Sequence, residues 1–361
     1  MSCQKDWFDV PIEPIVDDIP HDETEYIAVF GDIQYYTNPT YINLYNRSIA
    51  WILAQQKLGI KFDCVLHTGD VTQKNEHSAW ELFHNSTHEL ADSILYVSMI
   101  GDHDYTWDGQ FITSRESTHF NDYVGFPNTL SSVESWFESG RMENIVIRNT
   151  IHGERYDLLV LEFGPRPEVL EWANDWVSSH PEIKYILMNH EYLESDGGRR
   201  TDGLKCAARL RNCSTFTTPE QVWNDLVKCN DNIICVLCGH VGGLYAVTMD
   251  TNDFGHEVPQ IQHNIQSPQY RYDNWLMLWE FPAESDSANV FIYNTQTGHY
   301  YDNANTLFKF KYREKTTVAM RDISKFNATR EVVSLNGIHA RGRRSISIVQ
   351  EDGKTKKVIS K

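Results

Sequence analysis

The sequence lacks the features that would place it in a membrane or on the secretory route. It has no apolar run of about 18 residues, the length that a membrane-spanning helix requires. Its first residues, Met1 to Pro20, are acidic and polar and do not resemble a secretory signal. Internal repeats and low-complexity segments are also missing. These absences favour an intracellular protein without membrane association, either cytoplasmic or a component of a virion or other assembly.

A disulfide framework is missing as well. The chain has seven cysteines, an odd number, and four of them lie between Cys206 and Cys235. This pattern predicts mostly free thiols in a reducing compartment. Cys235 and Cys238 form a C-x-x-C pattern, but they fall inside a predicted strand, where alternation sends the two side chains to opposite faces. We interpret them as two small buried residues.

Basic residues are scarce except at the end of the chain. The formal net charge is −18, yet residues 311–361 contain 13 Lys and Arg against 5 Asp and Glu, a net of +8. An acidic body with a basic tail indicates two functional parts. A solvated appendage is favoured over a docking segment for an anionic partner. The acidic body disfavours nucleic acid as a partner unless a metal or the tail assists, so that partner stays open.

What the sequence does contain is an alternation of strand and helix patterns. Its 361 residues are 41% hydrophobic, enough for a large core. Short β-branched runs end near residues 32, 70, 102, 164, 190 and 240, and amphipathic patterns lie between most of them. The segments 274–281 and 289–294 are predicted to pair as antiparallel strands. The alternation predicts an α/β fold with a parallel-type sheet covered by helices on both faces.

Three parts of the chain are distinguished. We predict an N-terminal extension at residues 1–25, a main domain at 26–310, and a basic C-terminal extension or arm at 311–361. The arm alternates polar and apolar residues, which indicates a few short strands or an extended segment. Such an arm could add a strand to a partner protein or to a second copy of the chain.

Charged and imidazole side chains follow the predicted strands. In sheets of this kind, sites form at the carboxyl ends of the strands. Several residues with a glycine before them occupy such ends, where glycine permits a tight turn. The clustered residues are Asp32, Asp70, Asp102, His103, His190 and His240. Carboxylates and imidazoles gathered at one edge need a counter-ion, so they predict one or two divalent cations. Mixed Asp and His ligands suit Mn²⁺, Fe or Zn²⁺ better than Ca²⁺.

The same residues form an ordered series of motifs. The series is GDIQ at 31–34, GD at 69–70, GDHD at 101–104, a lone His190 and GH at 239–240. It resembles the calcineurin-like metallophosphoesterase superfamily, whose general form is D-x-H, G-D, G-N-H-[DE], H and G-H-x-H. The resemblance covers about residues 26–245. Each motif alone is weak, but five in the right order, each at a predicted strand end, are a strong indication.

Three positions depart from that general form. Gln34 stands in place of the first histidine, Asp102 in place of the asparagine, and Gly242 in place of the last histidine. We interpret Gln34 and Gly242 as features of a branch of the superfamily with a D-x-Q first motif. The stretches 161–173, 190–197, 239–243 and 258–266 are similar to that branch.

The resemblance implies a two-sheet β-sandwich flanked by helices, with a small C-terminal extension, and two metal positions. One position would use Asp32, Gln34 and a bridging Asp70, and it lacks the last histidine. The other would use Asp70, Asp102, His190 and His240. We expect one well-formed position and one weaker position that fills when substrate is present.

The implied reaction is hydrolysis of a phosphate mono- or diester by a metal-activated water. His103 would act as general acid toward the leaving group, with Asp104 orienting its imidazole. Arg199 and Arg200, in the glycine-flanked loop after His190, are predicted to bind the substrate phosphate, although solvated loop arginines are the commoner case.

An alternative function is a catalytically weak or inactive protein that serves as a structural or docking component through its basic arm. The three departures and the uneven charge favour this alternative. Retention of His103 disfavours it, because a general acid has no structural role that requires its position. The substrate itself is not fixed by the resemblance, since one fold serves many substrates.

Overall fold

The computed structural model describes residues 24–106, 112–201, 215–304 and 306–313, and the backbone of 345–351 and 354–360. The chain divides into two compact units, one ending at Lys315 and one spanning Thr316–Lys361. Each unit is described by itself. The predicted N-terminal extension lies almost entirely outside the described residues, because the first strand begins at Thr24.

The first unit contains two sheets, and the first of these has seven strands. Its order is β14-β13-β12-β1-β2-β3, with β15 also paired to β13. β1, β2 and β3 run parallel, whereas β12 and β13 add antiparallel strands on the other side of β1. The strands are β1 (Thr24–Phe30), β2 (Lys61–His67), β3 (Leu95–Ser98), β12 (Trp275–Pro282), β13 (Ser287–Asn294), β14 (His299–Tyr300) and β15 (Phe308–Lys311).

The second sheet has eight strands. Its order is β10-β11-β9-β8-β7-β5-β4, with β6 also paired to β7. β7, β8, β9 and β11 are mutually parallel, and the strands at both edges are antiparallel. The strands are β4 (Val133–Trp136), β5 (Ile145–Ile147), β6 (Thr150–Ile151), β7 (Glu154–Leu161), β8 (Lys184–Asn189), β9 (Ile233–Cys238), β10 (Tyr245–Thr251) and β11 (Glu257–His263).

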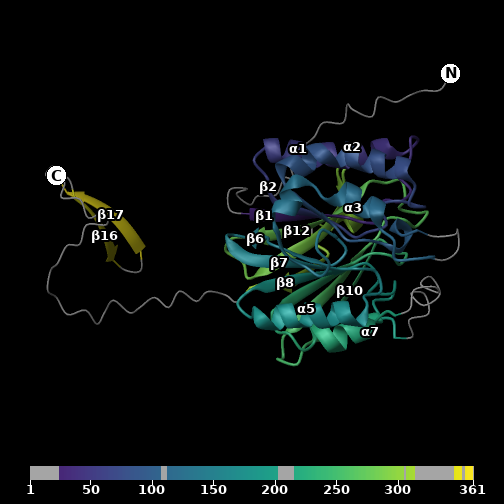
Figure 1. The fold of residues 1–361 in the computed structure, drawn as a ribbon. Helices are drawn as coiled ribbons and strands as arrows, with labels where there is room; N and C mark the ends of the chain where they lie inside the picture. Colours follow the sequence, from purple (N-terminus) through teal and green to yellow (C-terminus); the bar gives the residue numbers. More distant parts are fainter. Residues whose placement is uncertain are drawn as a thin grey trace, which may run out of the picture. The chain divides into compact units, whose positions relative to one another are not determined.

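Helices cover the outer faces of the two sheets. Figure 1 shows α1 and α2 along one side of this unit and α5 and α7 along the opposite side, with the strands between them. The helical segments are α1 (Ile42–Lys57), α2 (His77–Ser93), α3 (Thr118–Val124), α4 (Pro127–Ser131), α5 (Pro167–Ser179), α7 (Pro219–Val222) and the short turns η2 (Asp102–Asp104), η3 (Trp223–Val227) and η4 (Tyr301–Asn303). Among the described helices, none combines the length and apolar character needed to cross a membrane.

This arrangement confirms the predicted two-sheet sandwich flanked by helices. The separate expectation of one sheet with helices on both faces is wrong, because each sheet packs its inner face against the other sheet. Cys235 belongs to the larger core, whereas Cys238 packs with α5 and η3 in the second core. The two thiols therefore point to opposite faces of β9 as predicted. The four cysteines that the structure describes are all free.

Two predicted boundaries differ from the structure. The domain end at residue 310 falls inside β15, and the buried ring of Tyr312 packs against Phe281 at a centroid distance of 5.0 Å. The strand expected to reach Asp102 ends at Ser98. The chain leaves the sheet there because Asp104 caps the backbone N–H of Gly101 and closes the short turn η2.

The second unit contains an antiparallel hairpin of β16 (Ser345–Glu351) and β17 (Lys354–Ser360). This agrees with the short strands expected in the basic arm. The partner-binding role of residues 311–361 stays a prediction.

Candidate metal centre

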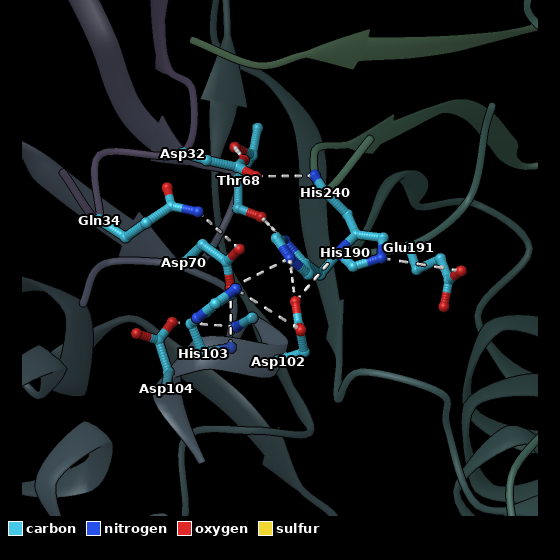
Figure 2. A network of polar contacts seen from close by, with 12 residues as sticks. Asp32, Gln34, Thr68, Asp70, Asp102, His103, Asp104, His190, Glu191 and His240 are labelled. Carbon is cyan, nitrogen blue, oxygen red and sulfur yellow. Dashed lines mark hydrogen bonds and ion pairs between the residues drawn. The ribbon is translucent and has the colours of Figure 1, made fainter. Parts of the chain in front are cut away.

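Four buried side chains meet at the carboxyl ends of the parallel strands. Their ligand atoms all lie within 4.8 Å of one another, and we call them the ligand cluster: Asp70, Asp102, His190 and His240. The first sheet supplies the two carboxylates, after β2 and β3, and the second sheet supplies the two imidazoles, after β8 and β9. Figure 2 shows the four side chains converging from these elements. The cluster matches the better-formed of the two metal positions that the sequence predicts.

The orientation of His190 is fixed by a backbone group. Its Nδ1 lies 2.5 Å from the carbonyl oxygen of Thr68, which can only accept, so Nδ1 carries the proton. The other nitrogen, Nε2, then faces the carboxylates of Asp70 and Asp102 at 3.3 and 3.5 Å. It is buried and makes no normal hydrogen bond among the described residues. In a metal-ligating histidine, one ring nitrogen typically donates its proton to a carbonyl or carboxylate while the other nitrogen binds the metal. His190 has this arrangement, with Nδ1 on a carbonyl and Nε2 toward two carboxylates.

His240 is held by its backbone as well as its ring. Its φ of +65° is unusual for a residue with a side chain, and its N–H donates to Asp32 Oδ2 at 2.9 Å. Its Nδ1 lies 3.0 Å from Asp102 Oδ1, inside the ligand cluster. Its Nε2 lies 3.9 Å from Glu191 Oε1, and Glu191 in turn pairs with Arg200 Nε at 3.1 Å. An acidic residue and an arginine thus stand behind the outer nitrogen of this imidazole.

The charges within the ligand cluster oppose one another strongly. Burial disfavours the charged form of Asp102, yet the neighbouring His240 and His190 imidazoles hold the pKa of its carboxyl well below its usual value. Burial likewise opposes a charge on His190, but Asp70 and Asp102 raise its pKa well above normal. Two buried carboxylates and two imidazoles need positive charge between them. The donor set fits a divalent transition-metal ion.

Asp32 is also buried at this edge, and its carboxylate accepts four hydrogen bonds. Its Oδ1 accepts from Thr68 Oγ1 at 2.8 Å. Its Oδ2 accepts from His240 N at 2.9 Å, from Asn264 Nδ2 at 2.8 Å and from Gln266 Nε2 at 3.2 Å. Burial raises the pKa of this carboxyl to about 7. Asp32 therefore lies outside the ligand cluster, within a separate hydrogen-bonded group.

Gln34 shares that group, which we call the amide cluster: Asp32, Gln34, Asn264 and Gln266. Its Nε2 donates to Asp70 Oδ2 at 3.1 Å and to Gln266 Oε1 at 3.0 Å. The amide thus presents a donor, not an oxygen ligand, to Asp70. The predicted metal roles of Asp32 and Gln34 do not fit this geometry. Asn264 and Gln266 were missed, although both follow β11, which runs parallel to β9 and so ends at the same edge.

His103 lies beside the ligand cluster. Its backbone N–H donates to Asp70 Oδ1 at 3.0 Å, and its Nε2 lies 3.9 Å from Asp102 Oδ2. Its Nδ1 lies 2.8 Å from the carbonyl oxygen of Gln73 and donates to it. The imidazole side chain is 10% exposed.

Asp104 is hydrogen-bonded to the loops around it. Its carboxylate accepts from the backbone N–H groups of Gly101, Val71 and Thr72 at 3.0, 3.1 and 2.9 Å, and from the Thr72 hydroxyl at 3.2 Å. These four donors match the acceptor capacity of a carboxylate. Asp104 therefore ties together the loops after β2 and β3, and the carbonyl of Gln73 accepts from the His103 ring. The orienting role of Asp104 stays a prediction.

Both predicted phosphate-binding arginines are neutralised by acidic residues. Arg199 pairs with Glu220 at 2.9 Å and with Asp250, and it stacks over Trp223 at 4.5 Å. Arg200 pairs with Glu191 and Glu194. These contacts argue against phosphate binding, because each guanidinium already has anionic partners on this side of the fold.

A different arginine, which sequence reasoning missed, borders the amide cluster. The guanidinium of Arg271 lies 3.5 Å from the ring centroid of Tyr35, directly after Gln34, and its Nε donates to the carbonyl of Gln266 at 2.8 Å. It is half-buried. No pattern in the sequence distinguishes it from other loop arginines.

Two glycines are required for close approach. A Cβ at Gly101 would collide with the backbone and carboxylate of Asp70, and one at Gly239 would collide with Asp32. Neither has a positive φ, so the tight-turn explanation does not apply to them. These glycines let neighbouring loops pack their acidic residues side by side.

Comparison with known proteins adds to this geometry. Residues 26–243 match the calcineurin-like phosphoesterase family. An uncharacterized protein of Bacillus subtilis (strain 168), YvnB, is 27% identical over 303 residues, or 80% of this chain. The chain spans only 21% of the length of that relative.

Two solved structures are similar at low identity. One is a conserved uncharacterized protein, a predicted phosphoesterase, from Streptococcus pneumoniae TIGR4, with 11% identity, a TM-score of 0.32, and coverage of 80% of this chain and 98% of that one. The other is Vacuolar Protein Sorting 29 from Cryptosporidium parvum, with 12% identity, a TM-score of 0.30, and coverage of 81% and 100%. The family match covers more than half of the 361 residues and contains the whole ligand cluster, so the chain belongs to the calcineurin-like phosphoesterase family.

Proposed function

We propose that this chain hydrolyses phosphate mono- or diesters with a divalent metal ion held by the ligand cluster. The observation that carries the proposal is the cluster itself: two carboxylates and two imidazoles, all buried, within 4.8 Å at one edge of both sheets. Such an ion acts as a Lewis acid toward a phosphoryl oxygen and lowers the pKa of water. Mn²⁺, Fe and Zn²⁺ are all compatible with these donors.

His103 is the proposed general acid. Because its Nδ1 proton is held by the Gln73 carbonyl, the ring can donate from Nε2 only when it is protonated at both nitrogens. The Asp102 carboxylate, 3.9 Å from Nε2, stabilises that charged form. Nε2 would pass its proton to the leaving oxygen of the ester, which removes the cost of expelling an alkoxide.

Arg271 replaces Arg199 and Arg200 as the proposed phosphate-binding cation. It lies against Tyr35 and the Gln266 carbonyl at the border of the site, and its stacking on Tyr35 fixes the plane of the guanidinium. A fixed guanidinium suits two-pronged contact with phosphate oxygens.

The proposal is tested by loading the purified chain with Mn²⁺ and measuring hydrolysis of nitrophenyl phosphate and bis(nitrophenyl) phosphate. We expect metal-dependent turnover that falls on the order of 1,000-fold in His190→Ala, the several kcal/mol that a metal contributes to such a reaction. His88→Ala, an exposed histidine on α2, is the matched control and should keep full activity.

Equal activity in His190→Ala and the wild type would contradict the proposal. Absence of turnover in the folded, metal-loaded wild type would instead favour the second candidate, an inactive member that docks through its basic arm. The observation behind that candidate is the separate C-terminal unit with its β16–β17 hairpin. Deleting residues 316–361 would then abolish capture of a partner protein while leaving the first unit folded.

A further inference from the structure

We propose that the amide cluster takes the place of a second metal ion, so that the centre binds one divalent ion per chain. This inference rests on the metal site of the proposed function. The second metal position is the one that the family resemblance assigns to Asp32, Gln34 and a bridging Asp70. In this chain, neutral hydrogen-bond donors occupy that position permanently.

A continuous chain of side-chain hydrogen bonds joins the two carboxylates that a second ion would bridge. Gln34 Nε2 donates to Asp70 Oδ2 at 3.1 Å and to Gln266 Oε1 at 3.0 Å. Gln266 Nε2 then donates to Asp32 Oδ2 at 3.2 Å. Figure 2 shows the amide nitrogen of Gln34 turned toward Asp70. Two glutamine amides therefore connect Asp70 to Asp32 without a cation.

The direction of the Gln34 amide follows from its hydrogen-bond neighbours. If the Gln34 amide were reversed, its oxygen would face the Asp70 carboxylate and the Gln266 oxygen, and both contacts would be repulsive. In the orientation described, its Oε1 is buried without a hydrogen-bond partner among the described residues. The two hydrogen bonds that Nε2 donates to acceptor oxygens therefore outweigh the missing hydrogen bond of Oε1.

Gln266 is held from several sides. Its Nε2 donates to the His240 carbonyl at 2.5 Å as well as to Asp32, and its backbone N–H donates to Asn264 Oδ1 at 2.7 Å. Asn264 Nδ2 donates to Asp32 Oδ2 at 2.8 Å. A cation at this position would have to displace several buried donors, each of which would lose its acceptor.

The last ligand of a second position is also missing. Gly242 has no side chain, and a Cβ there would meet only the hydroxyl of Ser267. Among the described residues, the donors to Asp32 are a hydroxyl, a backbone N–H and two amides, and none is an imidazole. Asp70 Oδ1 accordingly faces the ligand cluster, and Asp70 Oδ2 accepts a hydrogen bond from the amide cluster.

Metal stoichiometry tests the inference without relying on activity. The chain is stripped with a chelator, reloaded with Mn²⁺, desalted, and measured by elemental analysis and by electron paramagnetic resonance. We expect one Mn²⁺ per chain with the six-line spectrum of an isolated ion. Asp32→Asn keeps an oxygen acceptor and should also bind one ion, whereas His190→Ala removes a ligand of the cluster and should lose roughly tenfold or more in affinity.

Each outcome has a distinct meaning. Two ions in the wild type, with the spectrum of a coupled pair and a fall to one in Asp32→Asn, would overturn the inference and leave the proposed function standing. No ion in the wild type would overturn the metal site of the proposed function, and the inference with it. Calorimetric titration with Mn²⁺ provides the second measurement if a variant is poorly folded.

Discussion

The ligand cluster and the amide cluster are both built from buried polar side chains, but their hydrogen bonding differs. In the ligand cluster, His190 Nε2 and His240 Nδ1 make no normal hydrogen bond among the described residues, whereas in the amide cluster the Asp32 carboxylate accepts from four donors. Buried polar atoms without partners are costly unless something else satisfies them. The difference locates the proposed ion in the ligand cluster and the proposed substitute for a second ion in the amide cluster.

The largest effect that we expect is on the rate of hydrolysis, when His103 beside the ligand cluster is replaced. We expect His103→Asn to slow hydrolysis of an alkyl phosphate ester about 100-fold, the scale of general acid catalysis. A nitrophenyl ester should be slowed far less, because its leaving group needs no proton. Rates on the two esters, measured beside the metal content of the variant, check this. Equal losses on both esters would contradict a proton-donating role.

A smaller effect is expected in the amide cluster. Gln266→Ala removes a donor from Asp32 and an acceptor from Gln34, so the free energy of unfolding should fall by about 2 kcal/mol. Thermal unfolding of the metal-free chain measures this directly. Gln269→Ala, exposed in the same loop, is the matched control and should unfold like the wild type. If Gln266→Ala were as stable as that control, the amide cluster would not hold the site together.

The smallest effect concerns the residues behind His240. Glu191→Gln should weaken Mn²⁺ binding about tenfold, the lower end of the range for residues that orient a metal ligand. Glu194→Gln, which also loses a contact to Arg200 but lies farther along the loop, should leave the affinity unchanged. Calorimetric titration of both variants gives the ratio. Equal affinities in the two variants would mean that Glu191 has no part in orienting the imidazole.

The sequence predicted the parts of the site that depend on strand order. Asp70, His190 and His240 follow strands whose apolar runs are plain, and parallel strands bring such ends to one edge. The same rule would have found Asn264 and Gln266 if the parallel strand β11 had been recognised, but its alternating pattern resembles an antiparallel edge.

The roles of individual side chains were harder to predict. The Gln73 carbonyl, which had no predicted part, faces the His103 imidazole because loop geometry decides which acceptor faces an imidazole, and no residue pattern encodes that geometry. The partners of Arg199 were equally hard to predict, because the acidic residues that neutralise it lie on other elements, Glu220 on α7 and Asp250 on β10.

The division of the ligand cluster between the sheets has a mechanical consequence. Asp70 and Asp102 extend from the first sheet, and His190 and His240 from the second. An ion bound there would act as a cross-link that fastens the two layers of the sandwich at one rim. By linkage, each increment of binding free energy would then resist separation of the layers, so the ion would strengthen the fold as well as serve its chemistry.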